Sequence, residues 1–288
     1  MLERDIARKL LAVEDMPTLP AVMSQLLGVV EDENSSAQDL TAILEQDLAI
    51  STRILRLANS AFYGLRYKVD SLRRAVVVIG FDAVRMLALA TSVFDALSRQ
   101  SQFAFDPEEF WLHSLGAAKA AQLMSKGIKG VESAEGCFTA ALLHDMGKYC
   151  LALALKDDYA AIVRCAEQQK NPLAVVERSV LQTTHADVGM WLADKWRLPA
   201  MITDAVGYQH RPLGYTGPYL LEVAVVGLSS EFARMANYGY AGDYDPPAFY
   251  PPSMDRLGLG KEQADRIKVE LGEYFEEARR FLGILQES

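Results

Sequence analysis

The sequence lacks the features that mark secreted and membrane-spanning proteins. It has only three cysteines, an odd number at spacings unlike those of zinc-binding pairs, and we interpret them as free thiols in a reducing cytoplasm. No apolar run approaches the ~20 residues that a helix needs to span a bilayer. The N-terminal stretch MLERDIARKLL is too charged to be the core of a signal peptide. We therefore expect a cytoplasmic protein with no membrane partner.

Basic residues are also in deficit. The 29 lysines and arginines are outnumbered by 38 aspartates and glutamates, which gives a formal charge of −9. Non-specific binding to nucleic acid needs a net basic surface, and no basic recognition helix stands out, so we expect no nucleic-acid partner. Half of the residues are apolar and 23% are charged, which is typical of a globular protein and not of a disordered one.

Stretches that alternate between apolar and polar residues are few, whereas apolar residues recur at spacings of three and four almost throughout. This periodicity predicts an all-α protein. Local signals mark several helix starts. Ser36 and Asp39 resemble a capping box, and Asp47 can cap the helix that follows it. Asp106 precedes a proline at the first helical position, which is a strong start signal.

We expect the helices to form two lobes packed on each other, an N-terminal helical bundle and a lobe that carries the histidines. A composition shift near residues 100–107 suggests the boundary. The prolines, glycines and tyrosines of residues 239–260 predict a long loop before a last helix. The predicted segments are 1–105 for the N-terminal lobe, 106–238 for the histidine-bearing lobe, and 239–288 for the loop and C-terminal helix.

Histidine is scarce and is confined to one part of the chain. The chain has only four, His113, His144, His185 and His210, and Asp145 directly follows the second. A single histidine is more often a core residue or a helix-end residue than a ligand. Four of them with an aspartate inside about 100 residues, and none elsewhere, indicate a metal centre. Iron, manganese, zinc or nickel would suit mixed imidazole and carboxylate ligation, as one ion or two.

The HDMGK run at residues 144–148 carries the most specific chemistry. Ligands of a water-activating metal must approach the ion from different directions. Adjacent His144 and Asp145 can do so only if the helix ends or bends there, and Gly147 would permit this. Lys148 would then lie one step from the metal, where its ammonium could hold a substrate phosphate.

This run, in an all-helical chain with one upstream and two later histidines, resembles the HD superfamily of metal-dependent phosphohydrolases. The N-terminal half is more specific. The MPTLP run (16–20), QDLAISTRILRLANSAFYG (46–64) and AVVVIGFDAVRMLALA (75–90) resemble the HD-related output domain family, HDOD. The resemblance covers roughly residues 10–235. It implies that the histidine-bearing lobe is HD-like.

The resemblance implies a ligand set for this chain. The family's last metal-binding aspartate matches Ser230, whose hydroxyl is a poor ligand, and a His-His pair matches Gln209 and His210. Two ligands are thereby lost. The metal ligands that remain are His113, His144, Asp145, His185 and His210.

Two functions stay open at this point. The resemblance favours a bacterial signal-transduction output or scaffold protein with a partly degenerate metal site, which acts through signalling protein partners and binds a phosphate-containing small ligand. The alternative is an active metal-dependent phosphohydrolase on a nucleotide or cyclic dinucleotide, with Asp145 and Lys148 as catalytic residues. Ser230 and Gln209 favour the first function, and the intact HDMGK run favours the second.

Overall fold

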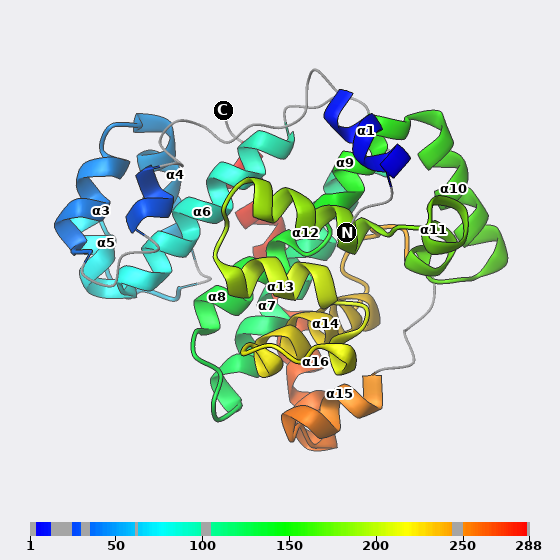
Figure 1. Cartoon of the computed structure of the whole chain (residues 1–288). Coiled ribbons are helices and arrows are strands. Elements are labelled where there is room, and N and C mark those ends of the chain that lie inside the picture. Colours follow the sequence, from blue (N-terminus) through cyan, green and yellow to red (C-terminus); the bar gives the residue numbers. More distant parts are fainter. Residues whose placement is uncertain are drawn as a thin grey trace. The chain divides into compact units, whose positions relative to one another are not determined.

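The computed structural model describes residues 4–12, 25–29, 35–60, 63–98, 105–243 and 250–286. Over these ranges the regular structure is entirely helical (Figure 1), which confirms the all-α prediction. The MPTLP run and Phe62 lie outside the described residues. The chain divides into two compact units, one of residues 1–17 with 100–273 and the other of residues 18–99 with 274–288. We call them the histidine unit and the N-terminal unit.

Local caps order the helices of the N-terminal unit. The predicted capping box of Ser36 and Asp39 is present, Asp47 accepts a hydrogen bond from the Ile50 amide, and Ser71 caps the next helix. The unit includes the helices α3 (Ala37–Leu44), α4 (Leu48–Ala58), α5 (Leu72–Ile79), α6 (Phe81–Ser98) and residues 274–286 of α16 (Lys261–Gln286).

Asn59 fixes the corner after α4. Its Nδ2 donates to the carbonyls of Leu55 and Val69, both at 2.7 Å, and its Oδ1 accepts the Val69 amide at 2.7 Å. One side chain thus satisfies backbone groups both at the end of the helix and in the returning loop.

Among the described residues, no single helix is long and apolar enough to cross a membrane. Helices α5 and α6 meet the length and composition of a span only as a pair, and the pair bends by 119° at its break.

The histidine unit is built around α7 (Pro107–Gly127), most of whose side chains are buried. The Asp106 carboxylate caps it and Pro107 follows, as predicted. The remaining elements of the unit are α1 (Arg4–Ala12), α8 (Ala134–Leu143), α9 (Met146–Leu155), α10 (Asp157–Gln169), α11 (Leu173–Leu181), α12 (His185–Lys195), α13 (Ala200–Tyr208), η1 (Pro212–Gly214), α14 (Leu220–Met235), α15 (Tyr250–Leu257) and residues 261–273 of α16 (Figure 1). Helix α7 packs on α8 and α14, and α12 packs on α9 and α13.

The prediction of an unbroken loop over residues 239–260 is wrong. Residues 250–257 form α15, although two prolines follow Tyr250. Proline is tolerated in the first turn of a helix, because the amide groups there have no partner within the helix. Pro251 and Pro252 therefore lie at the start of a helix and do not exclude one.

Candidate metal centre

The helix that carries His144 breaks where the two adjacent ligands require it. Helix α8 ends at Leu143 and α9 begins at Met146, so His144 and Asp145 form the junction between them. Gly147 serves a different purpose from the predicted bend. A Cβ atom on Gly147 would collide with the carbonyl of His185 and lie 2.6 Å from the amide of Gly189. Its missing side chain lets the backbones of α9 and α12 touch.

The first group of ligands lies between α7 and the α8–α9 junction. The Nε2 of His144 is 3.3 Å from Oδ2 of Asp145, and the Nε2 of His113 is 4.0 Å from the same oxygen. All three side chains are only 1% exposed. One ligand atom from each lies within 4.8 Å of the others, which is close enough for one ion.

The second group shares Asp145 and takes its imidazoles from α12 and the end of α13. The Nε2 of His185 is 3.3 Å from the other carboxylate oxygen, Oδ1 of Asp145, and 2.6 Å from the Nε2 of His210. These three residues also offer ligand atoms within 4.8 Å of one another. The structure therefore brings all five predicted ligands together, with one oxygen of Asp145 facing each group.

The hydrogen bonds of the imidazoles show what the centre needs. The Nδ1 of His144 is 2.6 Å from the carbonyl of Ala141, which can only accept, so Nδ1 carries the hydrogen and a neutral ring has its lone pair on Nε2. That lone pair faces the Asp145 carboxylate. Among the described residues, neither His144 Nε2 nor Asp145 Oδ1 has a hydrogen-bond partner, although both are buried. A cation in the first ligand group would satisfy His144 Nε2, and a cation in the second would satisfy Asp145 Oδ1, so the residues fit a metal ion.

Glu177 repeats this arrangement at His185. Its Oε2 accepts the amide of His185 at 2.8 Å and the Nδ1–H of the same residue at 2.7 Å, while the hydroxyl of Tyr159 donates to Oε1 at 2.6 Å. The carboxylate fixes the ring so that Nε2 faces Asp145 and His210. Glu177 is fully buried. Sequence reasoning missed it, because an isolated glutamate inside α11 has no local signal.

The surroundings favour the protonation states that a metal needs at three of the ligands but not at His185, where burial opposes the charge but Glu177 outweighs burial and raises the pKa. Burial lowers the pKa of His113 to about 3, helped by the nearby His144. Burial and then His185 lower the pKa of His210 to about 3 as well. Burial opposes ionisation of Asp145, but His144 and Lys148 outweigh it and hold its pKa well below the usual range. At neutral pH the centre thus offers two neutral imidazoles and a carboxylate.

Lys148 holds Asp145 in place. Its ammonium donates to Oδ2 of Asp145 at 2.7 Å, to the carbonyl of Ala241 at 2.7 Å and to Oδ2 of Asp243 at 2.8 Å. An ammonium has three donors, and all three are used. The side chain is fully buried, and although burial opposes its charge, Asp145 and Asp243 outweigh burial and raise its pKa. A substrate phosphate would have to displace one of these acceptors.

Asp243 was not foreseen, because it lies 95 residues after Lys148 in the segment predicted to be a loop. Its second oxygen accepts the amide of Leu173 at 3.3 Å, at the start of α11. Gly239 brings the segment into place: it has φ +54°, and a Cβ there would collide with the carbonyl of Glu109 and lie 2.8 Å from the amide of His113. The chain passes directly against α7 before it reaches the lysine.

The two positions where the resemblance implies a lost ligand behave differently. Ser230, on α14, places its Oγ 3.2 Å from the Nε2 of His113, so a longer acidic side chain there would reach the first ligand group. Gln209 donates from Nε2 to the backbone carbonyl of His144 at 2.6 Å. Through this hydrogen bond Gln209 supports the backbone of the α8–α9 junction.

A family model and two curated proteins match parts of this chain. A model of the HDOD domain family matches residues 16–212. An uncharacterized protein of Treponema pallidum (strain Nichols) is 21% identical over 198 residues, which make up 69% of this chain and 38% of that protein. The uncharacterized protein YuxH of Bacillus subtilis (strain 168) is 28% identical over 102 residues, 35% of this chain and 24% of that protein. The chain therefore spans less than two fifths of the length of either curated relative.

Solved structures share the fold over almost the whole chain. An HDOD domain protein of unknown function from Geobacter sulfurreducens is 25% identical, with a TM-score of 0.81, over 98% of this chain and 97% of that one. A protein of Marinobacter aquaeolei VT8, provisionally named for signal transduction, is 22% identical with a TM-score of 0.81, over 99% of this chain and 66% of that one. A provisionally named phosphohydrolase of Shewanella amazonensis SB2B is 23% identical with a TM-score of 0.76, over 97% and 98%.

Proposed function

The chain belongs to the HDOD family, and we propose that it is a metal-binding signalling module that passes the state of its centre to a protein partner. One observation carries the metal part. The hydrogen bond from Nδ1 of His144 to a backbone carbonyl leaves its buried Nε2 without a hydrogen-bond partner among the described residues, 3.3 Å from Oδ2 of Asp145. Two acceptors buried face to face repel each other unless a cation or a proton lies between them.

The centre is better suited to holding an ion than to turning over substrate. A bound divalent ion would polarise a phosphate and lower the pKa of a bound water. Four of the five predicted ligands are at most 1% exposed to solvent: His113, His144, Asp145 and His185. The fifth, His210, is partly exposed. The neutral hydroxyl of Ser230 contributes less to holding an ion than the aspartate implied by the resemblance. We therefore expect weak or absent hydrolysis.

Phosphohydrolase activity is the second candidate, and the shared carboxylate favours it. Asp145 directs one oxygen to each ligand group, which is an arrangement that could bridge two ions. The provisional name of the Shewanella relative agrees with this chemistry for that protein. In such an enzyme Asp145 would hold the ions, and Lys148 would hold Asp145 in position.

Metal analysis tests the proposal. The protein is purified without chelator, loaded with manganese, iron, zinc or nickel, desalted, and its metal content measured beside His144→Ala and the exposed control Asp158→Asn. We expect stoichiometric metal in the wild type and the control, and little in His144→Ala. Equal metal in all three proteins would refute the centre. Hydrolysis of mononucleotides or cyclic dinucleotides that His144→Ala abolishes would establish the enzyme instead of the signalling module.

The signalling part has its own measurement. Amide hydrogen exchange is compared between metal-free and metal-loaded protein. A module that reports its metal state changes exchange in surface segments away from the ligands. Changes confined to the segments that carry the ligands would contradict an output role and leave a purely structural ion.

A further inference from the structure

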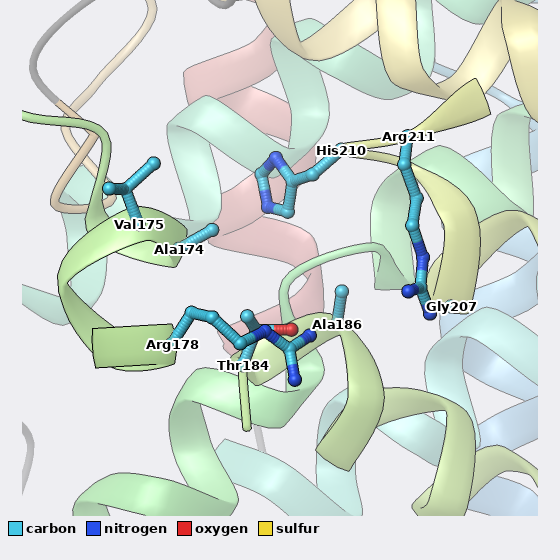
Figure 2. Close-up of a pocket in the computed structure, with 8 residues that line it drawn as sticks. All are labelled: Ala174, Val175, Arg178, Thr184, Ala186, Gly207, His210 and Arg211. Carbon is cyan, nitrogen blue, oxygen red and sulfur yellow. The ribbon is translucent and has the colours of Figure 1, made fainter. Parts of the chain in front are cut away.

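A cavity of about 280 Å³ opens beside the metal centre. Of the five predicted metal ligands, His210 lines it. Figure 2 shows the His210 imidazole above it, with Ala174 and Val175 of α11 along one wall and Arg211 along the other. Arg178 extends along the floor toward Thr184. The volume lies at the small end of ligand sites, so the cavity suits a small molecule.

Charge at this cavity is unbalanced. Arg178 and Arg211 both pair with one carboxylate, that of Asp187, at Nη2–Oδ2 2.6 Å and Nη2–Oδ1 3.3 Å. Asp187 also accepts hydrogen bonds from the amide and hydroxyl of Thr184, and burial opposes its ionisation less than these partners favour it, so its pKa is lowered. Two guanidinium groups against one carboxylate leave one positive charge in excess. An added anion would balance it.

The two arginines keep donors available for such an anion. The side chains are 47% and 55% exposed, whereas that of Asp187 is 18% exposed. Arg178 uses Nη1 to cap the end of α11 at the carbonyl of Gln182. Arg211 stacks its guanidinium 4.9 Å from the centre of the Tyr208 ring, which leaves its edge turned toward polar partners. The arginines come from α11 and from the segment after α13, so they approach the cavity from two directions.

We propose that this cavity binds a small organic oxyanion, a phosphate ester or a carboxylate, whose charged group is held by Arg178 and Arg211 and whose apolar part lies against Ala174, Val175 and Ala186. The inference rests on the proposed function, since it names the ligand of the same centre. His210 lines the cavity and also belongs to the second ligand group. An anion in the cavity therefore lies next to the ion, and its binding can report or alter the state of the metal.

The test measures binding of inorganic phosphate and of acetate to the full chain by calorimetry, first without metal and then with manganese loaded. We expect saturable binding of at least one probe to the metal-free protein, weakened about tenfold by Arg211→Gln and by Arg178→Gln. Arg164→Gln, an exposed arginine of α10, is the matched control and should bind as the wild type does. Stronger phosphate than acetate binding identifies a phosphate ester as the ligand, and the reverse identifies a carboxylate.

Folding and metal loading are followed beside the binding. Arg178→Lys keeps the charge if loss of the Gln182 cap unfolds Arg178→Gln, and it should retain most of the affinity. No saturable binding of either probe, or equal binding in Arg211→Gln and the wild type, overturns the anion site even when metal loads normally. Anion binding that depends on the arginines in a protein that takes up no metal supports the anion site and refutes the metal centre, so the two failures are distinct.

Discussion

Replacing Lys148 by methionine tests the arrangement at the core of the centre. Methionine keeps much of the volume and removes a positive charge that contacts both Asp145 and Asp243. Both carboxylates are buried, so each would lose a charged partner at less than 3 Å. Removing one partner of a buried ion pair typically costs about 3–5 kcal/mol. We expect the histidine unit of the metal-free variant to lose a free energy of unfolding in this range.

Urea unfolding followed by tryptophan fluorescence measures this loss. The three tryptophans, Trp111, Trp191 and Trp196, all lie in the histidine unit, so the signal reports the unit that contains the lysine. The N-terminal unit contributes nothing to it. A loss below about 1 kcal/mol would refute the reasoning, because the two carboxylates would then not depend on the ammonium.

The pH dependence of the Lys148→Met variant gives a second check. In the wild type the pKa of each of the two carboxyl groups is lowered in the folded state, so their stabilising contribution is complete above the unfolded pKa of about 3.9 and is lost only as pH falls below it. Without the lysine, burial is opposed only by the remaining neighbours, among them His144 for Asp145 and Arg234 for Asp243, so both folded pKa values rise above those of the wild type. The variant should therefore regain stability, relative to the wild type, as pH falls from 7 toward 5. The double variant Lys148→Met with Asp243→Asn should recover part of the loss at pH 7.

Three further predictions follow from single contacts. Ser230→Asp should raise the metal content after desalting, because it adds a carboxylate beside His113, and an unchanged content would show that residue 230 does not reach the ion. Glu177→Gln should weaken metal binding by roughly tenfold or more by releasing His185, whereas Tyr159→Phe, which loses only a hydroxyl on the far oxygen, should change it little. Gly147→Ala should destabilise the histidine unit by at least about 2 kcal/mol in the same urea assay, because the added methyl collides with the backbone of α12, while Gly272→Ala in an open helical position should be neutral or stabilising.

Sequence reasoning succeeded where the signal is local. The capping residues Ser36, Asp47 and Asp106 act as predicted, because a cap depends on amide groups within a few residues of it. It failed where the effect of a residue depends on its position within a helix. The prolines after Tyr250 were read as part of a loop, yet the same residues are compatible with the first turn of a helix.

The supporting residues of the centre could not be found this way. Asp243 and Glu177 contact Lys148 and His185 through the fold, and no spacing in the sequence relates the members of each pair. The adjacent residues Gln209 and His210 show a related limit of sequence reasoning. His210 faces the ligand group, whereas Gln209 supports the backbone of His144, and only the three-dimensional structure distinguishes these directions.

The buried charges of the centre favour the binding of a cation. Asp145, Asp243 and Glu177 are buried carboxylates, and Lys148 is a buried ammonium that contacts the first two. These four groups alone carry a balance of −2, to which a protonated His185 would add one positive charge, so a cation is favoured at the centre. An aspartate at residue 230 would make the balance −3 and would favour a second ion or a bound proton. We therefore expect the centre to bind a cation with a serine at residue 230, and the metal content of Ser230→Asp beside the wild type tests how much a carboxylate there would add.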